Sequence, residues 1–254
     1  MSYSLNPKHI ISLYRCFFRT LILLMVCAIT LGCQPDWEEN KLSQIVKQNA
    51  LHVGIINGPQ TYYIGNAGAA GFDYELASDF ADYLGVTAII TVFYDHDALQ
   101  AALEQDDIDI AITGDALGDD LPHIDQYGPV LHYVNQVLVT SSETPNVNAE
   151  TTITVVANSS NHKLLTRELE TLSGKIEASY DMDKHEILRR LATGEVAATV
   201  VDSNALSIMR TRYPQLAIHQ ILALHQKVAW GLHTNSDDSL LAALYEFISQ
   251  SRGS

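Results

Sequence analysis

Residues 71–93 read GFDYELASDFADYLGVTAIITVF and predict a helix that is followed directly by a strand. Apolar residues recur on one face of this helix at helical spacing, namely Leu76, Ala77, Phe80 and Leu84. We expect Asp73 to N-cap the helix and Gly85 to end it. The β-branched run at residues 86–93 then reads as a strand.

The flanking segments extend this pair into a repeating unit. Upstream, residues 51–56 read as a buried strand that the turn residues 57–59 end. Downstream, residues 97–105 read as a short helix, and apolar side chains alternate through Ile108, Ile110 and Ile112 in a third strand. This β-α-β-α-β order predicts an α/β fold with mostly parallel sheets flanked by helices.

The second half of the chain continues the alternation after a turn-rich connector at residues 141–146. The expected strands are residues 153–157, 176–180, 196–201, 216–222 and 228–232. The expected helices are residues 161–172, 183–192, 205–213 and 238–248.

A weak internal repeat, which we call the internal echo, relates the two halves of the chain. Asp115 and Asp202 each end a strand that follows a helix and a tight acidic turn. Ordinary recurrence of β-α units explains this echo when it is taken alone. Two α/β lobes that present their strand carboxyl ends to a shared cleft explain it as well, because open α/β sheets bind ligands there.

The amino terminus predicts an export signal. Residues 1–32 carry three cationic side chains ahead of a short apolar run at residues 21–31. A membrane span takes about 20 apolar residues, and this run is about half that length. We therefore expect a signal peptide at residues 1–32 and a polar tether at residues 33–49.

The run Ile29-Thr30-Leu31-Gly32-Cys33 resembles a bacterial lipobox, which marks lipid attachment at Cys33. Cys33 would then be the sole cysteine of the mature chain, so no intrachain disulfide is expected. A plain cleaved signal that leaves a free Cys33 is the alternative. Gln34 follows Cys33, and by resemblance to lipoprotein sorting rules this favours the periplasmic face of the outer membrane.

The charge distribution excludes one class of partner and limits another. The formal net charge of the chain is −15, whereas nucleic-acid binding needs a basic footprint, so we expect no nucleic-acid partner. No Lys or Arg occurs between Lys47 and Lys163. The first half of the mature chain therefore has no permanently cationic side chain to offer a ligand.

Several motifs resemble bacterial solute-binding proteins of the amino-acid type, and more closely the amino-terminal ligand-binding domain of the lytic transglycosylase F family. They occur in order at residues 71–86, Tyr127-Gly128-Pro129, Val201-Asp202-Ser203, residues 213–217 and residues 238–244. The resemblance spans residues 40–248 and implies a two-lobed periplasmic-binding-protein-like fold (type II).

This resemblance also implies boundaries and a mode of action. Lobe 1 would comprise residues 50–137, completed by residues 228–254, and lobe 2 residues 138–227. Two crossing hinge strands are expected near Val134–Thr140 and Lys227–Leu232. The ligand would bind between the lobes, which close over it by hinge motion.

Three departures from these relatives bear on function. The transglycosylases continue into a domain with a catalytic Glu, whereas this chain stops at Ser254, so we expect no enzyme activity and no catalytic residue. The usual last helical segment is also shortened here. Amino-acid binders place a carboxylate-gripping Arg after the third strand, and Leu121 aligns there.

The resemblance carries nine candidate ligand contacts, which are Tyr62, Tyr63, Phe72, Thr113, Gly114, Asp115, Ser159, Ser160 and Asp202. The three aromatic residues would offer their ring faces to a ligand. Thr113 and Gly114 would offer a hydroxyl group and backbone groups. Ser159 and Ser160 precede a helix whose free N–H groups favour an anion. Asp202 would accept a ligand ammonium, and Asp115 adds a second carboxylate.

Several of these candidates also have a purely structural interpretation. The two tyrosines pack equally well in a core, and Phe72 fits core or hinge packing somewhat better than ligand stacking. Ser160 would cap its helix whatever its function. Asp115 could cap a turn, whereas Asp202 ends an apolar strand, where a carboxylate needs a partner.

No metal, cofactor or catalytic motif is recognisable. Asp95-His96-Asp97 is a local cluster that we interpret as a solvated turn, and no HExxH, CxxC, EF-hand, Gly-x-Ser-x-Gly or phosphate loop occurs. A cleft of acids and aromatics without a cation from lobe 1 suits a neutral or amine-bearing small molecule.

Two functional hypotheses follow, both for a monomer. The first is a lipoprotein that captures a solute for an ABC permease or as a sensor. The second is a non-catalytic regulatory relative of lytic transglycosylase F that acts with murein enzymes. A neighbouring permease gene would favour the first and neighbouring murein genes the second.

Overall fold

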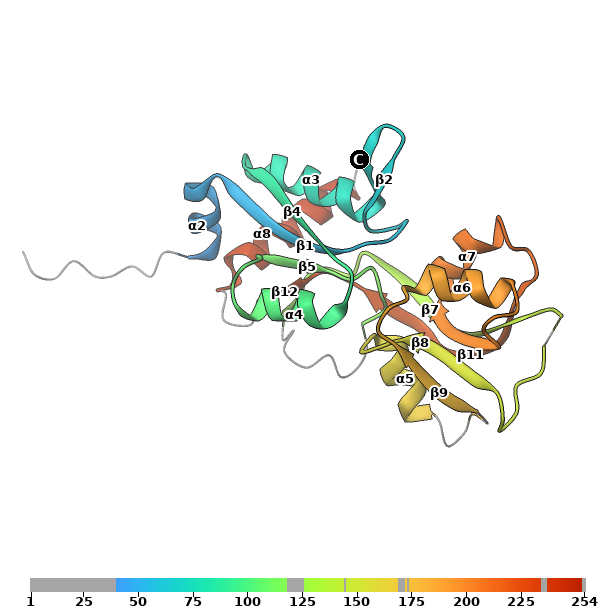
Figure 1. Cartoon of the computed structure of the whole chain (residues 1–254). Helices are drawn as coiled ribbons and strands as arrows, with labels where there is room; N and C mark the ends of the chain where they lie inside the picture. Colours follow the sequence, from blue (N-terminus) through green and yellow to red (C-terminus); the bar gives the residue numbers. More distant parts are fainter. Residues whose placement is uncertain are drawn as a thin grey trace, which may run out of the picture. The chain divides into compact units, whose positions relative to one another are not determined.

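The computed structural model describes residues 40–117, 126–143, 145–168, 172, 174–233 and 237–252 (Figure 1). Residues 40–254 form one compact unit. The predicted signal peptide, the lipidation at Cys33 and the position of Leu121 lie outside the described residues. Within the described ranges, no helix is both long enough and apolar enough to cross a membrane.

The first sheet has the strand order β4-β1-β5-β12-β6. Its strands are β1 (Ala50–Ile56), β4 (Thr87–Phe93), β5 (Ile110–Ile112), β6 (Gln126–Tyr127) and β12 (Gly231–Leu232). β4, β1 and β5 are parallel, and β12 is antiparallel to β5 and β6. The predicted β-α-β-α-β start of the chain is thus confirmed.

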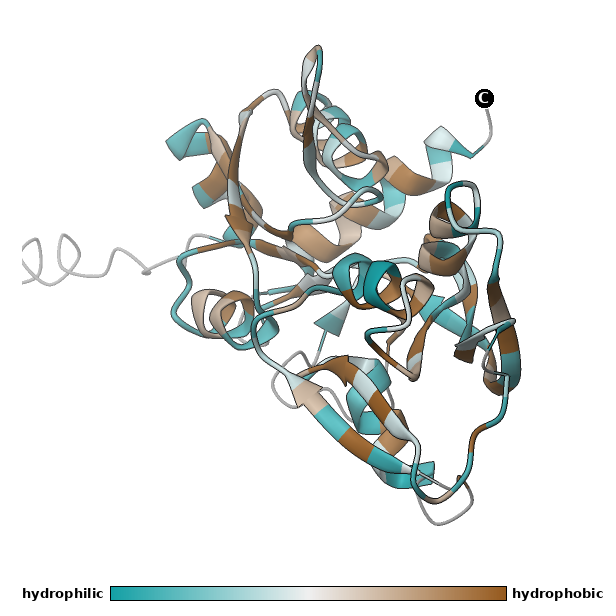
Figure 2. Ribbon diagram, turned by 45° about the vertical axis from the view of Figure 1, so that its right-hand side comes forward, coloured by the Kyte–Doolittle hydropathy of each residue, from teal (hydrophilic) through white to brown (hydrophobic). Residues whose placement is uncertain are grey.

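Helices cover this sheet and complete the first lobe. They are α2 (Lys41–Gln48), α3 (Phe72–Leu84), α4 (His96–Glu104) and α8 (Asp238–Ser251). The predicted inward faces of α3 and α4 are correct at Ala77 and Phe80 in α3 and at Leu99 in α4, which are all buried. Figure 2 shows apolar residues on the strands and polar residues on the outer helix surfaces.

The second sheet has the strand order β11-β7-β10-β8-β9. Its strands are β7 (His132–Ser141), β8 (Thr152–Val156), β9 (Lys175–Ser179), β10 (Ala198–Asp202) and β11 (Leu216–Val228). Here β8, β9 and β10 are parallel, whereas β7 is antiparallel to β10 and β11. The helices α5 (Ser160–Glu168), α6 (Lys184–Ala192) and α7 (Ser203–Arg210) pack on this sheet and complete the second lobe.

Two long strands carry the chain between the lobes. β7 follows β6 of the first sheet, and β11 leads back to β12. The prediction of separate strands at residues 216–222 and 228–232 was therefore wrong in detail, because β11 is continuous to Val228. Its pairing with β7 contains three register shifts, between Ile218 and Gln220, Ile221 and Ala223, and Ala223 and Gln226. The residue boundaries proposed for the lobes stay a prediction.

Two local features differ from the sequence prediction. A hairpin of β2 (Tyr63–Gly65) and β3 (Gly68–Ala70) was not predicted, since its strands are only three residues long. Asp73 does not cap α3, because the helix begins two residues earlier than predicted, at Phe72, and Gly71 occupies the N-cap position. The Asp73 side chain instead turns inward, where its Oδ1 accepts a hydrogen bond of 3.1 Å from Trp230 Nε1.

The amino-terminal helix α2 is fastened to the first lobe by an ion-pair cluster. Lys41 Nζ lies 2.7 Å from Asp106 Oδ1 and 2.8 Å from Asp109 Oδ1. The second Asp109 oxygen accepts the His52 backbone N–H at 2.7 Å. Asp106 and Asp109 thus anchor Lys41, in the predicted tether, to the first lobe.

Gly71 provides a test of how tightly the first lobe is packed. Its backbone has φ +137° and ψ 144°, a region that only glycine adopts readily, and a Cβ here would overlap the Thr61 carbonyl group. We predict that Gly71→Ala lowers the free energy of unfolding by about 3 kcal/mol or more in urea titrations.

Gly68→Ala is the matched control, because Gly68 has φ +117° but open space around an added Cβ. It should lose about 1–2 kcal/mol from backbone strain alone. Equal losses in the two variants would show that the contact with Thr61 contributes nothing.

Candidate functional site

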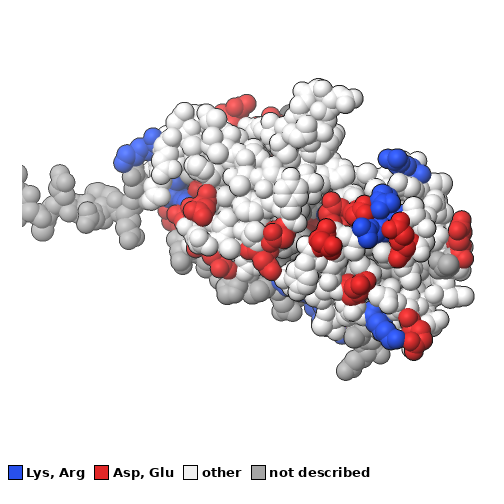
Figure 3. Space-filling view, in the orientation of Figure 1, with Lys and Arg blue, Asp and Glu red and all other residues white. Residues whose placement is uncertain are grey.

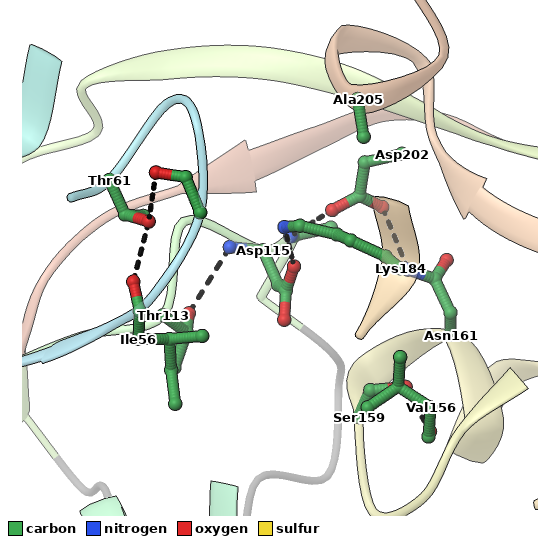
Figure 4. A network of polar contacts seen from close by, with 12 residues as sticks. Ile56, Thr61, Thr113, Asp115, Val156, Ser159, Asn161, Lys184, Asp202 and Ala205 are labelled. Atoms are coloured by element: carbon green, nitrogen blue, oxygen red, sulfur yellow. Dashed lines mark hydrogen bonds and ion pairs between the residues drawn. The ribbon is translucent and has the colours of Figure 1, made fainter. Parts of the chain in front are cut away.

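The two carboxylates of the internal echo meet where the lobes face each other. Asp115 follows the carboxyl end of β5, and Asp202 is the last residue of β10. The Ala116 backbone N–H of the first lobe donates to Asp202 Oδ2 of the second at 2.8 Å (Figure 4). The carboxyl ends of both sheets therefore border one site, as expected for ligand binding in α/β folds.

Lys184 was not among the predicted site residues, yet its ammonium occupies the centre of this site. It is the first residue of α6, and its Nζ lies 2.5 Å from Asp115 Oδ1 across the gap between the lobes (Figure 4). The side chains of Lys184 and Asp115 are 14% and 6% exposed. The cleft thus contains a cation, supplied by the second lobe rather than the first.

His96 is the second partner of Asp115. Its Nε2 lies 2.7 Å from Asp115 Oδ2, and its Nδ1 is buried with no partner among the described residues. The interpretation of Asp95-His96-Asp97 as a solvated turn was therefore wrong for His96. Asp95 caps α4 by accepting the Ala98 N–H at 2.7 Å, and His96 is the first residue of that helix.

The ion pair sets the ionisation of both its members. Burial opposes the charged form of Asp115, but the Lys184 charge and the His96 contact outweigh it and lower the pKa of Asp115. Burial likewise opposes the charge on Lys184, but Asp115, Asp202 and Asp73 together raise its pKa. Both groups are therefore charged near neutral pH, which makes this a buried interlobe salt bridge.

Asp202 lies beside this salt bridge in a different environment. It is fully buried, and burial together with the nearby Asp115 charge raises its pKa to about 6. Its hydrogen-bond donors among the described residues are neutral: the Ala116 N–H and the Asn161 amide, whose Nδ2 lies 3.3 Å from Oδ1. These donors hold the Asp202 carboxylate in place. The positive charge of Lys184 acts on Asp202 as well as on Asp115.

The amino-terminal end of α5 borders the same carboxylates. Ser159 caps this helix, since its Oγ accepts the His162 N–H at 3.2 Å, so the prediction that Ser160 is the cap was wrong by one residue. Ser160 and Asn161 are buried in its first turn. Gln136 Nε2 donates to Asn161 Oδ1 at 3.0 Å and orients the Asn161 amide toward Asp202.

Thr113 and Gly114 support Asp115 from the end of β5. The Asp115 backbone N–H donates to Thr113 Oγ1 at 3.2 Å. Gly114 has φ +67°, and a Cβ there would overlap the Thr61 side chain, so the backbone can approach this closely only at a glycine. These two residues position the carboxylate, and their predicted contact with a ligand stays a prediction.

The three predicted aromatic contacts lie apart from this centre. Tyr62 packs on the first-lobe core and meets the Tyr74 ring edge-on at 5.4 Å. Tyr63 is exposed in the β2–β3 hairpin, and Phe72, 59% exposed, does not pack in the core. None of the three lines either of the two cavities described next.

Two cavities lie between the lobes, and Tyr94, His96, Val156 and Asp183 line both of them. The inner one surrounds Lys184 and Asp115 and has a volume of about 30 Å³. The outer groove, about 410 Å³, is bordered by the exposed Tyr94 and Tyr180 and by four carboxylates, Asp95, Asp97, Asp181 and Asp183. Figure 3 shows acidic side chains on the surface of both lobes.

The described residues offer no cluster of three or more His, Cys, Asp or Glu side chains suited to a metal ion. The buried groups of the site are instead arranged for binding. The Asp202 carboxylate, the Asn161 amide and the amino terminus of α5 lie around the Lys184 ammonium. Such a site can hold a small molecule that carries a positive and a negative group.

Sequence reasoning found the two central carboxylates and missed the cation between them. One signal was available, because a Lys in the first turn of a helix opposes the helix dipole and needs another reason to be there. Lys184 follows the cap Asp183, which accepts the N–H groups of His185 and Glu186. No comparable signal marked His96, whose role depends on how α4 is oriented.

The sequence profile of bacterial extracellular solute-binding proteins, family 3, matches residues 51–252. A relative from Alteromonas mediterranea, "Membrane-bound lytic murein transglycosylase F", is 35% identical over 246 residues, 92% of this chain and 53% of that protein. A protein of the same name from Shewanella frigidimarina is 34% identical over 244 residues, 90% of this chain and 50% of that one. The chain spans about half the length of these relatives.

Solved structures share the fold. A mutant of ArgBP from T. maritima has a TM-score of 0.71 at 19% identity and covers 84% of this chain and 93% of that chain. A histidine-bound ABC uptake transporter substrate binding protein from Streptococcus pneumoniae has a TM-score of 0.72 at 18% identity and covers 85% and 92%. The predicted two-lobed type II fold is confirmed.

Asp73 generates a testable pH dependence. Burial raises its pKa to about 6, against the hydrogen bond from Trp230 and the charge of Lys184, which lower it. The folded state therefore binds more protons than the unfolded state between about pH 4 and pH 6, so this group's stabilisation is full below that window and is lost as the pH rises through it.

We predict that Asp73→Asn removes this loss. From pH 4 to pH 7 the variant should gain about 1–3 kcal/mol of unfolding free energy relative to the wild type, measured by urea titration. The exposed Asp79→Asn on the same helix is the control and should follow the wild type. Parallel pH curves for Asp73→Asn and the wild type would contradict the assignment.

Proposed function

The chain belongs to the bacterial extracellular solute-binding proteins of family 3, and on this premise we propose that it captures a small amine-bearing or neutral solute between its lobes. An amino acid, a peptide or a muropeptide-like compound has the right chemistry. The captured solute would serve transport or sensing, with an ABC permease as the partner for transport.

The observation that carries this proposal is the state of Asp202. It is a fully buried carboxylate at the end of β10 whose hydrogen-bond donors among the described residues are neutral. Burying such a group is costly unless it is paired, and its pKa is raised to about 6. A ligand ammonium beside Asp202 would form an ion pair with it. At present the only ammonium near Asp202 among the cavity-lining residues is that of Lys184, which also interacts with Asp115 and Asp73.

The other end of a zwitterionic ligand also has a place. The amino terminus of α5, at Ser160 and Asn161, borders the same carboxylate, and a helix amino terminus attracts an anionic group. A second carboxylate on the ligand would face Asp115 and Asp202 and be repelled. Glutamate and aspartate should therefore bind worse than lysine, a polyamine or a neutral amino acid.

The proposed location follows from the amino terminus and the family. We propose export to the periplasmic face of the envelope, with Cys33 lipidated and the protein held at the outer membrane as a monomer. The family is extracellular, and the relatives' printed name describes them as membrane-bound, which supports an envelope location. Radiolabelled palmitate incorporation that Cys33→Ala abolishes is the direct measurement of this anchoring.

Thermal unfolding of the full chain tests solute capture. We predict that a lysine, polyamine, neutral amino acid or muropeptide at about 100 times its dissociation constant raises the melting temperature by about 5–10 °C. Asp202→Asn should lose this response, because the amide cannot pair with an ammonium, whereas Asp107→Asn, an exposed change beside α4, should keep it. A larger shift in melting temperature with glutamate than with lysine would contradict the ligand assignment.

A second candidate function is regulatory, and the relatives favour it. The curated proteins that match most of this chain are named as murein transglycosylases, and the chain corresponds to about half of each. A non-catalytic relative could bind cell-wall fragments and act on murein enzymes. Adding the pure protein to a purified lytic transglycosylase, with and without muropeptides, and measuring the cleavage rate tests this; an unchanged rate would count against it.

A further inference from the structure

We propose that Lys184 is an internal ammonium that fills the amine position of the cleft, and that a ligand binds by displacing it from Asp115 with a primary ammonium of its own. This inference rests on the proposed solute-binding function of the same cleft. It deepens that function by naming the chemical group which the cleft recognises and the residue which competes for it.

The first step of the argument is space. With Lys184 in place, the free space of the inner cavity is about 30 Å³, far less than the 410 Å³ of the outer groove. Apolar residues line the same cavity as Lys184, among them Val156, Ile187 and Val200. Withdrawal of the Lys184 side chain would open a narrow channel with apolar sides and a carboxylate at its end. That shape fits an alkylammonium.

The second step is charge. Lys184 is the sole Lys or Arg among the described residues that line the inner cavity. Its charge acts on three carboxylates, those of Asp73, Asp115 and Asp202. If Lys184 leaves without a replacement, these buried carboxylates keep only the His96 contact and neutral donors. The group that takes its place must therefore be a cation, and an anion is excluded.

The third step is an unused hydrogen-bonding group in the same cavity. Thr199 is fully buried and lines the cavity, and its Oγ1 has no hydrogen-bond partner among the described residues. A buried hydroxyl without a partner costs free energy, which a ligand atom or a water molecule would recover. Thr199 thus provides a second polar contact beyond the ammonium position.

The fourth step is the connection between the lobes. The Lys184–Asp115 ion pair joins the second lobe to the first, alongside the Ala116–Asp202 hydrogen bond and the bond of 2.6 Å from Asn158 Nδ2 to Asp97 Oδ2. The ammonium of Lys184 therefore already makes the contact between the lobes that the ammonium of a bound ligand would make. Ligands without an ammonium cannot replace that contact and should bind weakly.

Chemical rescue of Lys184→Ala tests the proposal directly. The substitution removes three methylenes and the ammonium, which together correspond to n-propylammonium. We expect the full-length variant to melt below the wild type, and saturating n-propylammonium to raise its melting temperature by about 5–10 °C. The wild type, whose site is filled, should shift by less than a third as much.

Matched controls separate charge, shape and position. The isosteric n-propanol and the anion propionate should leave Lys184→Ala unchanged. Lys175→Ala, which removes an exposed lysine paired with Glu150, should not respond to n-propylammonium. Rescue by propionate, equal rescue by n-propanol, or no rescue by n-propylammonium would overturn the proposal.

The test also works if Lys184→Ala does not fold alone. Dilution from urea should then recover folded protein in n-propylammonium and not in n-propanol, and failure in both would overturn the proposal. This experiment is separable from the test of the proposed function. Rescue of the variant without any solute response in the wild type would retain the ammonium position and reject a working receptor.

Discussion

The salt bridge between Lys184 and Asp115 is the interaction on which the arrangement of this cleft depends. It joins the amino terminus of α6 in one lobe to the end of β5 in the other, with both side chains largely buried. Buried ion pairs contribute little net stability when intact, but removing one partner leaves an uncompensated charge that costs about 3–5 kcal/mol. The pair therefore specifies how the two lobes meet more than it stabilises either one.

The neighbouring groups acquire their properties from this pair. Burial and the fixed charge of Asp115 raise the pKa of Asp202, and burial and the Lys184 charge lower the pKa of His185 to about 4. The site thereby contains fixed charges of both signs at the carboxyl ends of two sheets. A solute-binding protein requires such a site, because a ligand must exchange its hydration for preorganised partners.

The order of helices and strands was predictable from the sequence because hydrophobic periodicity and turn residues specify them locally, whereas the two-lobed arrangement was expected from the resemblance to solute-binding proteins. Asp202 was predictable as well, since a carboxylate at the end of an apolar strand needs a partner. The ion pair between Lys184 and Asp115 was not predictable as a contact, because the two residues lie in different elements and meet only through the packing of two lobes. Asp73 was assigned to a cap on local grounds, whereas a distant Trp230 fixes it in the core.

The central claim is that Lys184 holds the lobes together without a ligand, and the Ala116 backbone N–H reports on it most directly. This amide donates across the lobes to Asp202 and exchanges its hydrogen only when they separate. We predict, for hydrogen exchange followed by NMR in the absence of ligand, at least about tenfold faster exchange of Ala116 in Lys184→Met than in the wild type, with the β1 amides unchanged. Equal exchange of Ala116 in the two proteins would contradict the account.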